Sequence, residues 1–299
     1  MAAQLRGDIA DFCKGVLASI NLPPRLRNIF HPLEETPYKW TSIWLSIIST
    51  MLDPFFFYIF HVNDHKKCLR LDTNLMIAVC LIRLLVDSCH IIFICYHERR
   101  RRIIFVVLDA ICILPLPQVM TLIIRRARGS EFIDKVKWLK YTIIAQYLPK
   151  LIRICKLYIE AERAPGMPVG GYKTGSTLPF CFIIYLLPGH VFGGLWYLMA
   201  IERVTDCWKE ACSYGFGIFQ DALQYGIVEE TKFMPKLFYC LRWGLITTSS
   251  MAQDLRGSSD VEENLFVIWI VLTSLMLSFL VYGRLQIYLQ FGTQRLEER

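Results

Sequence analysis

Long apolar runs alternate with short polar segments along the chain, and six of the runs are long enough to be membrane-spanning helices. A helix needs about 20 mostly apolar residues to cross the roughly 30 Å hydrocarbon core of a bilayer. The six runs cover residues 43–62, 75–96, 103–124, 141–158, 180–201 and 264–285. This pattern predicts an all-α membrane protein with six transmembrane helices.

A further apolar segment, residues 237–248, is too short to cross a bilayer. It lies between the last two predicted spans and precedes the polar stretch Ser249-Ser-Met-Ala-Gln-Asp254. Irregular backbone is tolerated at membrane depth only where protein buries it or water lies beside it. A short helix that enters and leaves on one side, followed by such a stretch, indicates a re-entrant pore loop and therefore a channel.

The net charge of +7 is concentrated in short loops beside the apolar runs, where basic residues indicate the cytoplasmic side. Residues 97–102 hold four arginines and one glutamate and are predicted to be cytosolic. Residues 202–234 hold six acidic and three basic residues and are predicted to be external. Residues 125–140 do not fit this charge rule. They hold six basic and two acidic residues, yet the alternation of six spanning helices places them outside. In the oxidising external compartment we expect a disulfide that involves Cys207 and Cys212, with the pairing left open.

The fourth run carries cations at a regular spacing inside an otherwise apolar helix. Lys150, Arg153 and Lys156 recur every third residue, which places them on one slowly rotating stripe. Ionisable groups in spanning helices are costly and usually mark a function or face a partner. The first three runs each supply one carboxylate as a counter-charge: Asp53, Asp87 and Asp109. This arrangement is typical of a voltage-sensor-like four-helix bundle; the alternative is that static ion pairs hold the bundle together.

A stretch rich in proline and glycine, Ala164-Pro-Gly-Met-Pro-Val-Gly-Gly171, breaks helices and separates two halves of the chain. The first half holds four predicted spans, and the second holds two spans with the re-entrant loop between them. The predicted domains are a cytosolic N-terminal arm at 1–40, a voltage-sensor-like four-helix domain at 41–160, a linker at 161–175, and a pore domain at 176–299.

Short motifs with a family signature are spread over residues 40–299. They are Ile113-Leu-Pro-Leu-Pro-Gln-Val119, Tyr147-Leu-Pro-Lys-Leu-Ile-Arg-Ile154, Gly189-His-Val-Phe-Gly-Gly-Leu-Trp-Tyr-Leu198, Ile201-Glu-Arg203, Cys207-Trp208 and Tyr288-Leu-Gln290. On these motifs the chain resembles plant cyclic-nucleotide-gated channels. The resemblance implies a tetrameric six-helix cation channel with its pore on the shared axis, in a plasma-membrane or endomembrane setting, permeated by potassium, sodium or calcium.

The chain departs from that family in three places. It ends at Gln294-Arg-Leu-Glu-Glu-Arg299, where family members continue into a linker and a cyclic-nucleotide-binding domain, so we expect this chain to bind no cyclic nucleotide. It has Ala252-Gln-Asp254 where the family filter usually reads Gly-Gln and a neutral residue. It has Gly283-Arg-Leu-Gln286 where the pore-lining helix usually ends Gly-Asn-Met-Gln.

The predicted selectivity filter contains no Thr-Val-Gly-Tyr-Gly sequence of the potassium-channel type. Its residues are Ser250, Ala252, Gln253 and Asp254. In a tetramer, a ring of Asp254 carboxylates would concentrate cations and favour divalent ions. The alternative places Asp254 outside the filter, paired with Arg256 or Arg242. Because Ala252 lacks the backbone freedom of glycine, we expect the loop to adopt left-handed geometry less readily.

Met276, Leu280 and Arg284 lie four residues apart on one face of the last span and form the predicted inner gate. If this face lines the pore, the two apolar rings can gate it by dewetting. Arg284 at the inner mouth would oppose cation flow unless it turns toward the lipid headgroups, which is the orientation that we favour. His190 is expected to be a packing residue rather than a proton or metal site.

The sequence thus predicts a subunit of a tetrameric cation channel in the plasma membrane, with an endomembrane as the alternative location. Its expected partners are related channel subunits, membrane lipid and permeant cations, and no nucleic acid. No catalytic constellation, cofactor site or metal site is predicted, so the chain is not expected to be an enzyme. Two alternatives remain: a non-conducting regulatory subunit that co-assembles with full-length channels, and a transporter or receptor if residues 237–248 span the membrane fully.

Overall fold

The computed structural model describes residues 35–63, 66–97, 103–162, 172–209, 217–252, 255, 257 and 260–297. Nearly all of these residues are helical. The elements, in order, are α3 (Glu35–Leu52), η1 (Asp53–Ile59), β1 (Phe60–Asn63), β2 (Cys68–Leu71), α4 (Thr73–His97), α5 (Ile103–Ile113), α6 (Leu116–Arg126), α7 (Ser130–Glu162), α8 (Tyr172–Lys209), η3 (Gly217–Phe219), α9 (Gln220–Gln224), α10 (Phe233–Ser249) and α11 (Val261–Glu297). Most of the predicted N-terminal arm lies outside the described residues, as do residues 98–102, the arginine run that is predicted to be cytosolic.

Five segments within the described residues are long and apolar enough to cross a membrane. They are Trp40–Ile59, Thr73–Ile92, Val107–Arg126, Cys181–Trp208 and Val261–Gly283. The chain is therefore a helical membrane protein. The fourth predicted span lies within α7 but is not among the five, because Lys150, Arg153 and Lys156 interrupt its apolar character. The count of six spans stays a prediction.

The first predicted span is not one helix. The α-helix ends at Leu52, and the chain continues as the 3-10 helix η1 and then as strand β1. Pro54 has no backbone N–H and favours this change of structure. The strands β1 and β2 pair antiparallel, from Phe60 opposite Leu71 to Asn63 opposite Cys68. This hairpin corrects the sequence reading, which predicts no strand, because two strands of four residues are too short for a period-two pattern to stand out.

The third predicted span is two helices, α5 and α6, with Pro115 between them. A proline removes one backbone donor and prevents a continuous hydrogen-bond ladder. Gln146 on α7 donates its side-chain amide to the carbonyl oxygen of Leu114 at 2.6 Å. A side chain therefore supplies a partner at the break, as irregular backbone within a membrane requires.

Packing divides the chain into two compact units. The first comprises Met1–Asp53, Ile77–Leu122 and Tyr141–Pro165, and the second comprises Pro54–Met76, Ile123–Lys140 and Gly166–Arg299. Helix α7 contributes residues 130–140 to the second unit and the rest of its length to the first. This division follows packing rather than sequence order, and the sequential domain boundaries stay a prediction.

In the first unit, helices α3 to α7 bury one apolar face each against their neighbours. Ile43 and Ile47 on α3, Val79 on α4, and Ile143 and Ile154 on α7 are all buried. The helices that meet here thus share one apolar interior, within which the polar groups described below are placed.

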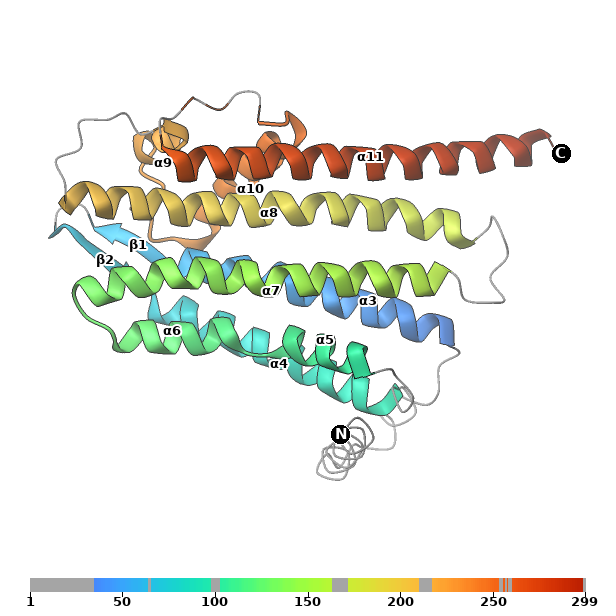
Figure 1. Cartoon of the computed structure of the whole chain (residues 1–299), viewed down its shortest axis with the longest axis horizontal. Helices are drawn as coiled ribbons and strands as arrows, with labels where there is room; N and C mark the ends of the chain where they lie inside the picture. Colours follow the sequence, from blue (N-terminus) through green and yellow to red (C-terminus); the bar gives the residue numbers. More distant parts are fainter. Residues whose placement is uncertain are drawn as a thin grey trace. The chain divides into compact units, whose positions relative to one another are not determined.

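In the second unit, α8 packs against both α10 and α11, and Figure 1 shows α11 running alongside α8. The backbones of α8 and α10 are close enough that a methyl group on Gly193 would meet the carbonyl of Cys240, and one on Gly244 would meet the carbonyl of Gly189. Gly189 and Gly193 are four residues apart, the spacing that lets membrane helices approach closely. These glycines fix α10 against α8.

Candidate functional site

The first unit buries cations and carboxylates together in its helical interior. Lys150 on α7 donates to Asp53 at the start of η1, with Nζ 2.5 Å from Oδ2. Arg83 on α4 approaches the other carboxylate oxygen, with Nη1 3.4 Å from Oδ1. All three side chains are at most 3% exposed. Opposite charges held this closely offset the large cost of removing each charge from water.

Arg153 lies one turn beyond Lys150 on α7. It forms an ion pair with Asp109 on α5 and contacts a ring nitrogen of His90 on α4. Its Nη1 also donates to Ser46 Oγ on α3 at 3.0 Å. Two of the cations predicted from the stripe thus each meet one of the predicted carboxylates. Lys156, the third, is half-buried.

Asp87, the remaining predicted carboxylate, forms its ion pair with Arg83 of its own helix, with Oδ2 3.2 Å from Nε. The amide of Gln118 on α6 donates to the same oxygen at 3.4 Å. The sequence reasoning missed Arg83 because it searched the fourth run alone for cations. The available signal was an arginine four residues before an aspartate in the second run, a spacing that puts both side chains on one helix face.

The second unit contains the predicted pore-loop helix, α10, which is not among the candidate membrane spans. Trp196 on α8 stacks on Trp243 of α10, with ring centroids 4.5 Å apart, and its Nε1 donates to the carbonyl of Ile218 at 3.0 Å. After Ser249 the backbone turns through Met251 (φ 51°) and Ala252 (φ 62°). A short helix packed on a spanning helix and ended by a left-handed turn is the geometry of a re-entrant segment.

Ala252 therefore adopts the left-handed geometry that the sequence reading expects it to resist. Its backbone N–H donates to the carbonyl of Thr247 at 2.8 Å, which holds the turn. For a residue with a Cβ atom this conformation costs roughly 1–2 kcal/mol. Gln253, Asp254 and Arg256 lie outside the described residues, so their predicted roles stay predictions.

The start of α10 is tied to η1, and the hairpin that follows η1 is tied to α8 and to the segment before α10. Lys236 is fully buried, and its Nζ donates to the carbonyl of Tyr58 at 2.8 Å. Tyr197 on α8 donates its hydroxyl to the carbonyl of Phe60 at 2.6 Å. The backbone N–H of Val62 donates to the carbonyl of Val228 at 2.8 Å. The unpredicted hairpin is thus part of the packing that positions the pore-loop helix.

Comparison with known proteins identifies relatives of the chain among plant ion channels. It is 33% identical to cyclic nucleotide-gated ion channel 1 of Arabidopsis thaliana over 87% of its own length, and it covers 45% of that protein. It is 32% identical to the probable cyclic nucleotide-gated ion channel 10 of the same plant, with 91% of the chain and 48% of the relative aligned. The chain is a homologue of the plant cyclic nucleotide-gated ion channels. It spans about half the length of the curated relatives that it matches. No family model and no solved structure matches it.

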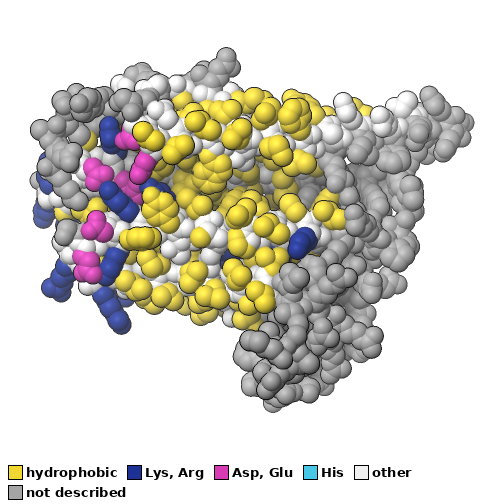
Figure 2. All heavy atoms as spheres, viewed as in Figure 1, with side chains coloured by type: hydrophobic (Ala, Val, Ile, Leu, Met, Phe, Trp, Pro, Cys, Tyr) yellow, Lys and Arg dark blue, Asp and Glu magenta, His cyan; other side chains and the backbone are white. Residues whose placement is uncertain are grey.

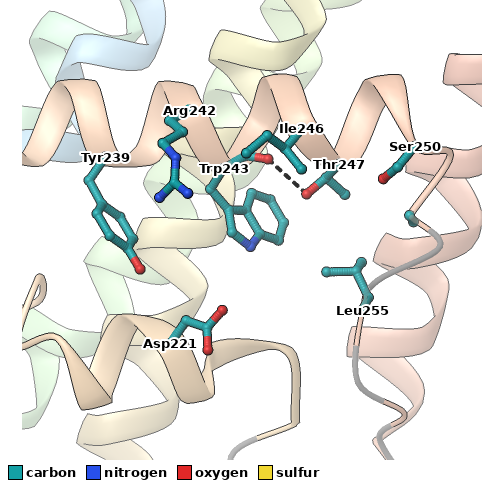
Figure 3. Close-up of a pocket in the computed structure, with 9 residues that line it drawn as sticks. Asp221, Tyr239, Arg242, Trp243, Ile246, Thr247, Ser250 and Leu255 are labelled. Carbon is teal, nitrogen blue, oxygen red and sulfur yellow. Dashed lines mark hydrogen bonds between the residues drawn. The ribbon is translucent and has the colours of Figure 1, made fainter.

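In this channel homologue, a pocket of about 150 Å³ opens between α9, α10 and the turn after α10 (Figure 3). Ser250 and Ala252 of the predicted filter line it, together with Leu255. Figure 3 shows Arg242 on α10 and Asp221 on α9 directed toward the pocket from opposite sides. The turn after α10 therefore has open space beside it within the single chain.

The last helix of the homologue, α11, packs on α8 through Phe192, whose ring lies 5.2 Å from that of Trp269. Most of its remaining apolar surface is uncovered in the single chain, and Figure 2 shows hydrophobic side chains along it. Met276 and Leu280, two members of the predicted gate, are 64% and 58% exposed. The side chain of Arg284 lies outside the described residues.

Two further sequence-based expectations concern the polar ends of the helices. Cys207 takes part in a disulfide. Cys212 lies outside the described residues, so the pairing stays a prediction.

The basic charge of residues 125–140 disagrees with the external side that six alternating spans give them. Two lysines of this region form ion pairs: Lys137 with Asp206, and Lys140 with Glu202. These two lysines therefore meet the start of the acidic loop, while the side of the membrane on which each segment lies stays a prediction.

Proposed function

We propose that the chain is a subunit of a tetrameric cation channel in the plasma membrane, permeated by potassium, sodium or calcium. Helix α10 and residues 250–254 form the pore loop, with the filter residues directed to the shared axis. Residues Met276, Leu280 and Arg284 of α11 line the inner gate. The buried network of the first unit acts as a sensor-like domain with the charges of Lys150 and Arg153 on α7.

The observation that carries this proposal is the position of α10. It is too short to span a bilayer, lies between two helices that can, and touches α8 backbone to backbone. A transporter or receptor in which this segment crosses the membrane is disfavoured by the same geometry. The exposed apolar surface of α11 provides the area that other subunits and lipid would cover, because such surface is not stable in water.

Current recording tests the proposal. The chain is expressed alone and together with a full-length relative, cyclic nucleotide-gated ion channel 1, and membrane currents are measured in potassium, sodium and calcium solutions. We expect cation currents at least when the two are expressed together. The conductance of these currents should differ from that of the relative expressed alone. Identical currents with and without the chain, despite its presence at the cell surface, would contradict it.

Asp254→Asn tests the filter assignment. If four carboxylates face the ion path, their removal lowers the local concentration of cations, and divalent ions lose more than monovalent ions. We expect lower relative calcium permeability and weaker divalent block. Glu229→Gln, which removes an exposed acid from the predicted external loop at residues 202–234, is the control and should leave both unchanged. Unchanged reversal potentials in Asp254→Asn would favour its pairing with Arg256 or Arg242.

A second candidate function is a non-conducting regulatory subunit. The backbone at Ala252 favours it, because a strained left-handed alanine stands where the resemblance implies a glycine. In that case the chain alone would be silent and would reduce or reshape the current of a full-length partner. Ala252→Gly combined with Arg284→Asn should then restore conduction to the chain expressed alone.

A further inference from the structure

Two ion pairs join the beginning of α7 to the end of α8 in the second unit. Lys140 Nζ lies 2.7 Å from Glu202 Oε2, and Lys137 Nζ lies 3.0 and 3.1 Å from the two carboxylate oxygens of Asp206. We call these the α7–α8 ion pairs. The side chains of Lys140 and Glu202 are only 7% and 10% exposed, whereas Lys137 and Asp206 are partly exposed. The Lys140–Glu202 pair is therefore the one that solvent screens least.

The same cluster reaches the start of α11. Lys140 Nζ lies 4.0 Å from Glu262 Oε2, and Arg203 Nη1 at the end of α8 lies 3.3 Å from Asp260 Oδ2. Figure 2 shows acidic and basic side chains gathered where α8 ends and α11 begins. One lysine of α7 thus lies among the ends of both helices that flank the pore-loop helix. Although partial burial acts to lower it, the hydrogen bond and charge of Asp206 raise the pKa of Lys137 above its ordinary value.

Helix α7 is continuous from Ser130 to Glu162 and also carries Lys150 and Arg153 of the buried network. A displacement of this helix by one turn along its axis is about 5.4 Å. Lys140 would move by the same distance, and its ammonium would leave hydrogen-bond reach of Glu202, which ends near 3.2 Å. A one-turn movement of α7 along its axis relative to α8 would therefore open this pair.

We propose that Lys140 and Glu202 are positioning residues that hold α7 against the pore-forming helices. The strength of this ion pair then sets the membrane voltage at which the channel opens or closes. The inference rests on the proposed channel function. It concerns the voltage dependence of that function, whereas conduction itself depends on the filter and gate.

The test uses Lys140→Gln, Glu202→Gln and the charge swap Lys140→Glu/Glu202→Lys, recorded with the full-length relative. Each single variant should change the ratio of open to closed channels at a fixed voltage about tenfold, the usual size of coupling between sites. The swap should return the ratio toward that of the unmodified chain, which a merely structural defect would not do. Lys135→Gln is the matched control, because Lys135 pairs with Glu131 within α7 itself, and it should change nothing.

Two conservative variants, Lys140→Arg and Glu202→Asp, keep the proposal testable if the single variants do not reach the cell surface. Each keeps the sign of its charge, so we expect a smaller change of the open-to-closed ratio, in the same direction as that of the corresponding single variant. Normal currents whose voltage dependence is unaffected by all of these variants would overturn the inference alone. Absence of any contribution of the unmodified chain to currents would overturn the proposed function and this inference together.

Discussion

Two contacts between helices, one in each packing unit, are fixed by different means. In the first unit, buried helices are joined by ion pairs such as Lys150–Asp53 and Arg153–Asp109. In the second, the contact between α8 and α10 is made by glycine backbone, with no room for a single methyl group at Gly244. Ion pairs act over several ångströms and can exchange partners, whereas backbone contact depends on shape alone. The contact around Asp53 in the first unit should therefore be sensitive to charge, and the α8–α10 contact in the second unit should be sensitive to volume.

The largest effect is expected from Gly244→Ala. The added methyl group would collide with the carbonyl of Gly189, which is part of a helix and cannot move aside. Overpacking in a close-packed interior typically costs about 1–3 kcal/mol, and it costs more where, as here, the collision is between backbone atoms that cannot move apart. We expect loss of folded protein in detergent, measured by thermal unfolding and size-exclusion chromatography.

Gly283→Ala on α11 provides the control for that substitution. A methyl group at Gly283 would meet nothing within 4 Å, and alanine favours a helix over glycine by roughly 0.5–1 kcal/mol. It should therefore be neutral or stabilising. Equal melting temperatures for the two variants would show that the α8–α10 contact does not depend on volume.

The next largest effect is expected from Asp53→Asn in the first unit. This change keeps the shape of the side chain but leaves Lys150 and Arg83 buried without their shared carboxylate. Removing one partner of a buried pair typically costs about 3–5 kcal/mol. Glu131→Gln, which removes an acid from a partly exposed pair, should cost less than about 1 kcal/mol. Thermal unfolding of both variants decides whether charge holds this unit.

The sequence predicted the helices well, because apolar runs of spanning length leave few alternatives in a membrane. It also identified Asp53 and Asp109 as partners of the α7 cations, since charges inside apolar helices must find one another. It could not predict the hairpin, the hydrogen bonds of Lys236, or the close approach at Gly193, because each depends on segments far apart in the chain. The sequence did hold a signal for Arg83, its position four residues before Asp87, but the prediction did not use it.

A smaller effect is expected at the turn after α10, where the second unit depends on the backbone angle φ of one residue, Ala252. Ala252→Gly should remove roughly 1 kcal/mol of strain, partly offset by the greater freedom of glycine in the unfolded chain. Ala200→Gly in the middle of α8 is the control and should destabilise by about 1 kcal/mol. Opposite signs in thermal unfolding are the expected outcome. Destabilisation by both would mean that the turn is not strained at Ala252.

The smallest effect is expected at His61, on the hairpin that follows η1. Partial burial, and then the charge of Lys236, lower the pKa of His61 below its ordinary value of 6.5. At higher pH the imidazole is neutral in both states. As pH falls through 6.5, the unfolded chain takes up the proton first, so the free energy of unfolding decreases with acidification. Because the side chain is only half-buried, solvent keeps this decrease below about 1 kcal/mol.

Two variants isolate this contribution from the rest of the acid response. His61→Gln should unfold with a shallower decline of melting temperature between pH 7.5 and 5.5, taken as roughly one unit on either side of the ordinary histidine pKa. Arg70 lies opposite His61 in the strand register, and its charge also lowers the pKa of His61. Arg70→Gln should therefore raise that pKa and reduce the decline in part. If His61→Gln loses stability with acid as steeply as the unmodified chain, other groups cause the response, and the hairpin is held by its backbone hydrogen bonds alone.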